Sequence, residues 1–345
     1  MADQESTVDR SGQRYHQPVM LRQVVELLVT DPDGVYIDGT IGGGGHAAAI
    51  VERLREGKLI GFDGDPDAIA ECRGAFREEL ASGSRSRVEL VLGSYLLACS
   101  REDLRARLAG QVCGILLDLG VSSHQLDEPT RGFSYRADSP LDLRFGGSAS
   151  DAPPASELLA ELSERELADV LYRYGEERSS RRIARAIVTA RRIAPIRTTG
   201  QLRAIVERCV PPRQRTDVLS RVFQALRIAV NRELEQLEEF LGCVPELLRP
   251  GGRIVVISYH SLEDRIVKQT FRRLAKETAP PLLRILTPKP LVPSAEEIAA
   301  NRRSRSAKLR AAERVGWKRL LCPDCIHTGM KRVAGEIFAC KASKI

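Results

Sequence analysis

The sequence predicts an α/β fold, in which a doubly wound parallel sheet is interrupted after its fourth strand by an all-helical insertion. Short apolar runs alternate with helical patterns up to about residue 117, as in parallel sheets covered by helices on both faces. Only helical patterns follow between residues 155 and 221, and an equally apolar run returns at residues 253–258. Two independent domains in tandem would leave the first half with exposed sheet edges, so one interrupted sheet is the simpler arrangement.

The first strand leads into a loop that contains four consecutive glycines. Residues 35–37 form a β-rich run that ends at Asp38, and an alanine-rich helical segment begins after His46. Glycine is required where the backbone takes positive φ or where a ligand approaches the main chain closely. The loop lies at the carboxyl edge of the predicted sheet, where open parallel sheets bind ligands.

Acidic residues follow the first two strands. Asp63 ends the second strand, where a carboxylate accepts hydrogen bonds from ribose hydroxyls in nucleotide-binding folds. Asp38 would repel a pyrophosphate, so the first loop suits a cofactor with a cationic amino-acid end, such as S-adenosylmethionine. From the loop alone, a methyltransferase and a nicotinamide-dependent oxidoreductase both remain open.

Length and composition set broad limits. A chain of 345 residues favours roughly two domains, and its net charge of +7 is compatible with a polyanionic partner. No apolar run approaches the ~20 residues that cross a bilayer, and the polar start lacks a signal-peptide core, so we expect a cytoplasmic protein without membrane contact. Eight cysteines are too few for a disulfide scaffold. Five of them are expected to act as small buried hydrophobes: Cys72, Cys99, Cys113, Cys209 and Cys243.

The helical insertion is rich in arginine. Residues 178–215 contain eleven arginines and a single acidic residue, Glu207. Arg181, Arg185 and Arg192 fall on one helical side. Such a run can be merely a solvated face, but a bias this lopsided favours contact with phosphates. A long helix is then expected over residues 222–241, ending near Gly242.

A series of motifs follows in fixed order along the chain. The motifs are Asp38-Gly39-Thr40-Ile41-Gly42 with Gly44-Gly45-His46, Asp63-Gly64-Asp65-Pro66, Leu117-Asp118-Leu119-Gly120-Val121-Ser122-Ser123, Gln125-Leu126-Asp127, Arg131-Gly132-Phe133-Ser134, Pro140-Leu141-Asp142, Tyr174-Gly175-Glu176-Glu177-Arg178, Phe223-Gln224-Ala225-Leu226-Arg227-Ile228 and His260-Ser261-Leu262-Glu263-Asp264-Arg265. Together they resemble the bacterial 16S ribosomal RNA (cytosine-N4)-methyltransferase family, also called MraW, over residues 15–315.

The resemblance implies a class I (Rossmann-like) methyltransferase that uses S-adenosylmethionine to methylate the exocyclic amine of a cytidine in the decoding region of 16S rRNA, in the small ribosomal subunit. It implies cofactor contacts at Gly44, Gly45, His46, Asp63, Tyr95, Asp118 and Gln125. Tyr95 and Tyr259 stand where relatives carry phenylalanine, and His124 where they carry proline.

The resemblance also suggests how the chain is divided. Residues 1–14 are expected to be disordered. Residues 15–126 and 222–315 would form the methyltransferase domain, residues 127–221 an inserted RNA-recognition domain, and residues 316–345 a cysteine-containing tail. In that tail, Cys322, Cys325, His327 and Cys340 nominally offer four zinc ligands, but Cys325 and His327 are only two positions apart, so free thiols are the default expectation.

An exocyclic cytosine amine is a poor nucleophile, because its lone pair is delocalised into the ring. The enzyme must hold the nitrogen in line with the sulfonium methyl group and accept a hydrogen bond from the amine. Asp118 could accept this hydrogen bond or could position the cofactor. In the second case, Asp142 and His260 are the weaker candidates for contact with the target amine. His260 could equally cap a helix, and Asp142 could be structural. No metal is expected, since the sulfonium is already a good leaving group.

The target base must leave its stack to reach such a site. Besides the oxidoreductase, one further alternative stays open at this stage. The chain could be a non-catalytic RNA-binding factor for ribosome assembly that retains the methyltransferase fold.

Overall fold

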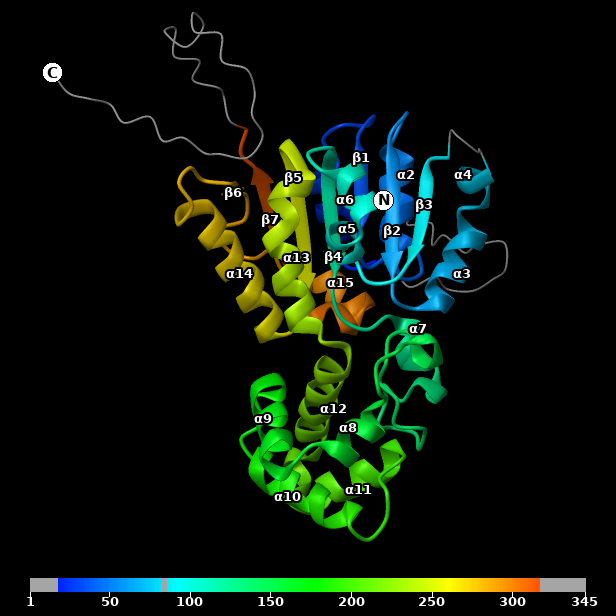
Figure 1. The fold of residues 1–345 in the computed structure, drawn as a ribbon, viewed down its shortest axis with the longest axis vertical. Helices are drawn as coiled ribbons and strands as arrows, with labels where there is room; N and C mark the ends of the chain where they lie inside the picture. Colours follow the sequence, from blue (N-terminus) through cyan, green and yellow to red (C-terminus); the bar gives the residue numbers. More distant parts are fainter. Residues whose placement is uncertain (1–17, 82–85, 317–345) are drawn as a thin grey trace, which may run out of the picture. The chain divides into compact units, whose positions relative to one another are not determined.

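A seven-stranded sheet forms the centre of the computed structural model, which describes residues 18–81 and 86–316 (Figure 1). The strand order is β3-β2-β1-β4-β5-β7-β6. The strands are β1 (Val35–Asp38), β2 (Lys58–Asp63), β3 (Val88–Leu92), β4 (Val112–Asp118), β5 (Leu248–Ser258), β6 (Leu283–Ile285) and β7 (Lys308–Arg314). Neighbours among β1 to β5 are parallel, whereas β7 is antiparallel to β5 and β6. The predicted fold class is confirmed. The N-terminal 14 residues and the possible zinc ligands of the tail lie outside the described residues.

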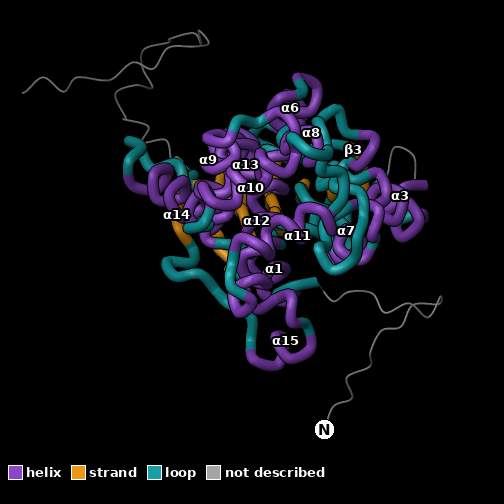
Figure 2. The backbone as a smooth tube through the Cα atoms, turned by 90° about the horizontal axis from the view of Figure 1, so that it is seen from below, coloured by secondary structure: helices purple, strands orange, loops and turns teal. Residues whose placement is uncertain are grey.

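Helices cover both faces of this sheet because its strand residues alternate between two apolar clusters. Tyr36 belongs to the cluster under α1 (Leu21–Leu28), α2 (Gly45–Arg53) and α3 (Pro66–Ala75). Ile37 belongs to the opposite cluster, under α5 (Leu97–Ser100), α6 (Glu102–Leu108), α13 (Glu233–Leu247) and α14 (Ser261–Lys276). In the perpendicular view of Figure 2, α1 and α13 lie on opposite sides of the strands. The short α4 (Arg77–Ala81) continues from α3.

The helical insertion leaves the sheet after β4 and returns before β5, which pairs directly with β4 through contacts such as Ile115 with Ile254. Its helices are α7 (Ser123–Asp127), α8 (Ala155–Glu161), α9 (Glu164–Gly175), α10 (Ser180–Arg191), α11 (Thr199–Cys209) and α12 (Arg215–Asn231). A separate apolar cluster runs from Phe133 to Val230. The expected boundary at residues 221 and 222 therefore falls inside α12, and we propose Arg232 as the boundary instead.

The long helix expected over residues 222–241 is in fact two helices, α12 and α13. They are separated at Arg232, whose φ of 50° is left-handed, and α13 continues past Gly242 to Leu247. The side chain of Asn231 holds this break, since its Oδ1 accepts from Phe145 N at 2.8 Å and its Nδ2 donates to Leu143 O at 2.7 Å. The apolar stripe continues across the break, so periodicity could not reveal it.

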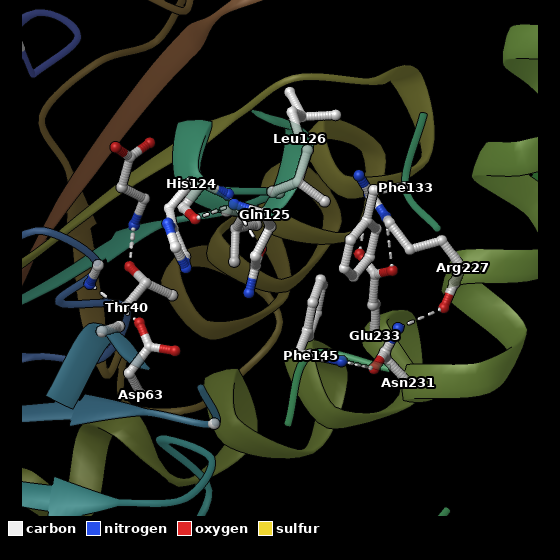
Figure 3. Close-up of a pocket in the computed structure, with 18 of the residues that line it drawn as sticks. Thr40, Asp63, His124, Gln125, Leu126, Phe133, Phe145, Arg227, Asn231 and Glu233 are labelled. Carbon is white, nitrogen blue, oxygen red and sulfur yellow. Dashed lines mark hydrogen bonds and ion pairs between the residues drawn. The ribbon is translucent and has the colours of Figure 1, made fainter. Parts of the chain in front are cut away.

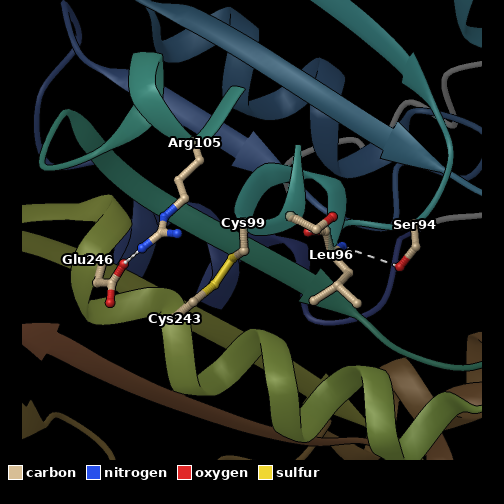
Figure 4. The surroundings of a disulfide bond; sticks show 7 residues. Ser94, Leu96, Cys99, Arg105, Cys243 and Glu246 are labelled. Atoms are coloured by element: carbon tan, nitrogen blue, oxygen red, sulfur yellow. Dashed lines mark hydrogen bonds and ion pairs between the residues drawn. A yellow bond between two sulfur atoms is a disulfide. The ribbon is translucent and has the colours of Figure 1, made fainter. Parts of the chain in front are cut away.

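Two of the cysteines expected to be single are joined: Cys99 and Cys243 form a disulfide between α5 and α13 (Figure 4). Their Cα atoms lie 6.5 Å apart, within the range that a disulfide spans. They are separated by 144 positions, so sequence spacing gave no sign of the pair. Cys72, Cys113 and Cys209 are buried and free, as expected.

The C-terminal strands close one edge of the sheet, with α15 (Ala295–Ala300) preceding β7. None of the described helices combines the length and apolar character needed to cross a bilayer.

Candidate active site

The glycine loop links β1 to α2 at the carboxyl edge of the sheet. Gly42 and Gly44 have φ values of 49° and 81°, which side chains rarely adopt. A Cβ on Gly44 would also come within 3.0 Å of the Phe76 ring, so glycine is needed here for space as well. Gly42, Gly43 and Gly45 line a large cavity, whereas Gly44 supports the loop from behind and does not line it.

Three carboxyl groups gather where β1, β2 and β4 end. Burial raises the pKa of Asp38 to about 7, that of Asp63 to about 6 and that of Asp118 to about 7. Asp63 accepts from the amides of Gly42 and Asp65, each at 2.9 Å. Asp38 accepts from Thr40 N through Oδ1, but its buried Oδ2 has no partner within residues 18–81 and 86–316. An acidic site with an unpaired buried oxygen suits a cationic ligand.

Asp118 lies between an imidazole and a phenol. Its Oδ1 accepts from Tyr259 Oη at 2.9 Å, and its Oδ2 lies 3.6 Å from His46 Nδ1. His46 Nε2 lies 3.0 Å from Val19 O, which can only accept, so that nitrogen carries the hydrogen. Burial lowers the pKa of His46 and keeps the ring neutral, which leaves its Nδ1 lone pair directed towards Asp118.

One cavity of about 1360 Å³ joins Asp63, Asp118 and His46 to the insertion, whereas Asp38 does not line it. Figure 3 shows Thr40, Asp63 and Gln125 on one side of it and Phe145, Arg227 and Glu233 on the other. Of the residues expected to contact a cofactor, all except Gly44 line this cavity: Gly45, His46, Asp63, Tyr95, Asp118 and Gln125. The cavity therefore brings together residues from five separate segments of the chain.

Gln125 and Tyr95 have other partners in the structure. Both ends of the Gln125 amide are engaged, because Nε2 donates to Asp65 Oδ2 at 2.9 Å and Oε1 accepts from Ser122 N at 3.0 Å. This side chain shapes the loop and caps α7. Tyr95 makes an edge contact with Phe240, with ring centroids 4.9 Å apart.

The amino-acid sequence is similar to a family of known proteins over most of its length. The MraW methylase family model matches residues 13–315. The chain belongs to the MraW methylase family. It is 48% identical over 318 residues to a ribosomal RNA small subunit methyltransferase H of Heliobacterium modesticaldum, covering 87% of this chain and 99% of that protein. A protein of the same name from Granulibacter bethesdensis is 46% identical over 314 residues, covering 86% of this chain and 91% of its own length.

This MraW methylase is thus an enzyme that transfers a methyl group from S-adenosylmethionine, and the nicotinamide-dependent alternative is wrong. The acidic cavity agrees with that cofactor. Its methionine end carries an ammonium group, and its methyl group is bound to a sulfonium, so both cationic centres match the carboxyl groups at the strand ends.

Two looser catalytic candidates of the methylase have structural partners. Asp142 forms a fork with Arg144, with 2.7 and 2.8 Å contacts, and does not line the cavity. His260 does line it, but it also caps α14: its Nδ1 accepts from Glu263 N at 3.4 Å, and its Nε2 lies 3.1 Å from Glu263 Oε1. The helix-capping alternative for His260 is therefore observed.

The three expected RNA-binding arginines lie on or just after α10, outside the cavity lining. Arg181 and Arg192 are exposed, and Arg185 is exposed with its guanidinium 3.3 Å from Glu164. The structure thus places these arginines on the surface of the insertion, apart from the carboxyl groups.

Three charged residues that had no predicted role also line the cavity of the methylase: Arg227, Glu233 and Glu263. A carboxylate oxygen of Glu233, a ring nitrogen of His260 and a carboxylate oxygen of Glu263 lie within 4.8 Å of one another. Arg227 and Glu263 stand inside two of the family motifs, which was the available signal. A second signal was available for Arg227 and Glu233, because each places a charge in an otherwise apolar helical stripe.

Proposed function

We propose that this enzyme methylates the exocyclic N4 amine of a cytidine in the decoding region of 16S rRNA, within the small ribosomal subunit. Its support is the near full-length similarity to relatives named ribosomal RNA small subunit methyltransferase H. The target position and the modified atom are inferred from the family resemblance of the sequence motifs. The activity belongs in the cytoplasm, where the small subunit resides.

S-adenosylmethionine supplies the methyl group. We propose that Asp63 accepts from the ribose hydroxyls, that Tyr95 stacks on the adenine, and that Gly45 and His46 border the methionine end. Gly44 shapes the loop, and Gln125 keeps α7 in place beside it. Asp38 does not line the cavity, but it accepts from the amide of Thr40, which does, and so places a carboxyl group behind the lining near the ammonium group.

Asp118 is our candidate for the group that accepts a hydrogen bond from the target amine. It ends β4, which is next to β1 in the centre of the sheet, and one of its oxygens is already fixed by Tyr259. The other oxygen faces the bare His46 Nδ1. A proton released as the amine becomes methylated can therefore stay on the Asp118 carboxyl group, whose pKa is about 7.

The arginines of the insertion are our candidates for the grip on the RNA backbone. Arg181, Arg185 and Arg192 present long cationic side chains on an exposed helix. Phosphate contacts of this kind position the RNA without reading its sequence.

The test is methyl transfer to small subunits that lack the modification, followed by nucleoside mass spectrometry. We expect N4-methylcytidine at a single position of 16S rRNA. Subunits that bind the enzyme but gain no methyl group would contradict the proposed substrate. A methyl group on another atom or another base would contradict the proposed target.

A further inference from the structure

We propose that the part of the cavity between Asp118 and Arg227 is the seat of the target base, in which Arg227 and Asp118 read its pairing edge as hydrogen-bond donor and acceptor. This base seat rests on the proposed function, because it takes the target to be a cytosine. It assigns a role to Arg227 and gives Glu233 and Tyr259 roles as positioning residues.

The order of the strands leaves this place open for a second ligand. The expected cofactor contacts at the glycine loop and Asp63 follow β1 and β2, whereas His260 and Glu263 follow β5, on the far side of β4. The cavity of about 1360 Å³ is also larger than the roughly 300–1,000 Å³ of a typical small-molecule site. One continuous space can therefore hold the cofactor and a base side by side.

Arg227 provides the donor side of the base seat. Its Nε and Nη2 donate to Glu233 Oε1 and Oε2 at 2.8 and 2.9 Å, which fixes the plane of the guanidinium. Its Nη1 makes no hydrogen bond to any residue that the structure describes, and Arg227 lines the cavity. A guanidinium that is held on one edge and open on the other is suited to bind acceptors of a planar ligand.

Asp118 provides the acceptor side of the base seat, and Tyr259 links it to Glu263. Tyr259 donates from Oη to Asp118 Oδ1 at 2.9 Å and from its backbone amide to Glu263 Oε2 at 2.8 Å. Glu263 in turn has a carboxylate oxygen within 4.8 Å of one on Glu233, the partner of Arg227. Hydrogen bonds thus join Asp118 to Glu263 through Tyr259, and Glu263 lies near the partner of Arg227.

A donor from Arg227 and an acceptor from ionised Asp118 would complement cytosine and not uracil. Cytosine presents two acceptors, O2 and N3, and one donor, the N4 amine. Uracil presents a donor at N3 and an acceptor at O4, so its O4 would face the Asp118 carboxylate without a hydrogen between them. Phe133 and Phe145 line the same cavity with stacked rings 5.9 Å apart, which adds an aromatic surface for a base that has left its stack.

Arg227→Met tests the base seat, and Arg221→Met is its matched control. Arg221 forms the same kind of pair with a buried glutamate, Glu177, at 2.7 Å, but neither residue lines the cavity. The probes are unmethylated small subunits with cytidine at the target position and the same subunits with uridine there. The ratio of their dissociation constants measures base discrimination, which a general loss of stability does not change.

We expect the wild-type enzyme and Arg221→Met to bind the cytidine subunits about tenfold to a hundredfold more tightly than the uridine subunits. In Arg227→Met the ratio of the two dissociation constants should be close to one. The dissociation constant of S-adenosylmethionine should stay within about twofold in all three. Arg227→Lys keeps the charge but loses the planar guanidinium with its two parallel bonds to Glu233, so an intermediate ratio is expected. This variant replaces Arg227→Met as the test if Arg227→Met does not fold.

Two results would overturn the base seat. One is an unchanged ratio in Arg227→Met, and the other is a parallel loss of cofactor binding, which would assign Arg227 to the cofactor. If the unchanged enzyme discriminates cytidine through Arg227 yet transfers no methyl group, the base seat stands and the proposed function fails.

Discussion

Asp38 is buried with one oxygen unpaired, and this makes the site sensitive to pH. Its pKa of about 7 in the folded protein lies above the ordinary value of about 4, so burial favours the protonated form. The neutral group stabilises the fold at low pH, and this contribution is lost as the pH rises through 7. A bound ammonium group reverses the preference, because it favours the carboxylate.

Asp38→Asn should separate these two effects. The variant stays neutral, so without cofactor its melting temperature relative to the unchanged protein should rise between pH 6 and pH 8. Its affinity for S-adenosylmethionine at pH 8 should fall about tenfold or more, because a buried negative charge close to the cationic cofactor is removed. Thermal melts and calorimetry at each pH measure both. A difference in melting temperature that does not vary with pH would contradict the assigned cause.

Tyr259→Phe tests how Asp118 is held. The Tyr259 hydroxyl lowers the pKa of this carboxyl group, against the larger effect of burial. Removing the hydroxyl should raise that pKa and move the acidic limb of the kcat/KM profile for subunits to higher pH, by about one unit. Initial rates of methyl transfer between pH 5.5 and 9 provide the profile. An unshifted acidic limb would mean that Asp118 does not titrate in the reaction.

At the same scale, the sequence predicted some site residues and missed others for a physical reason. Asp63 and Asp118 directly follow apolar strands, so their position at the ligand-binding edge could be predicted. Arg227 and Glu233 lie on either side of the turn at Arg232, and both line the cavity. Helical periodicity carries no information about such a turn.

Among the elements, the break between α12 and α13 is the feature that brings the insertion to the sheet. It places a residue with a side chain, Arg232, at positive φ, a conformation that costs about 1–2 kcal/mol. Asn231 offsets this cost by bonding to Phe145 N and to the carbonyls of Leu143 and Arg227. The turn therefore depends on side-chain bonding to a distant loop rather than on a glycine.

Asn231→Ala should destabilise the protein by about 2 kcal/mol, because it removes the partners of the part-buried Phe145 amide and Leu143 carbonyl. Urea denaturation of the cofactor-free protein measures this loss. The base discrimination described above should weaken too, since Arg227 stands one turn earlier in α12. Gln236→Ala removes a bond to the Asn231 carbonyl and the bond from Ser94 Oγ, but it leaves no backbone amide without a partner and should cost less. Equal losses in the two variants would contradict the central role of Asn231.

For the whole molecule, chemistry and RNA binding are assigned to different surfaces. Asp63→Ala should weaken S-adenosylmethionine binding about tenfold or more and leave RNA affinity within about twofold. The paired change Arg181→Ala with Arg185→Ala should do the reverse and reduce the salt dependence of RNA binding by about one to two units. The control is the paired change Arg101→Ala with Arg105→Ala, because Arg101 is the N-cap of α6 and Arg105 lies within that helix, outside the insertion. Equal loss of both affinities in either variant would contradict this division.

The overall topology could be predicted because the apolar strands before and after the insertion are alike. What could not be predicted was pairing between distant segments, such as Cys99 with Cys243 or Tyr259 with Asp118, 141 positions away. Such contacts depend on the three-dimensional path of the chain. The local pattern of residues does not encode it.

The pairing of β4 with β5 across the whole insertion has a consequence for biogenesis. During synthesis β1 to β4 emerge first, and about 130 further residues must be translated before β5 can pair with β4. Until then, one edge of the central strand lacks its neighbour and exposes a template for unwanted strand addition. The nascent enzyme is therefore most vulnerable to aggregation while the helical segment is still being made, and chaperones that shield exposed strands should act in that interval.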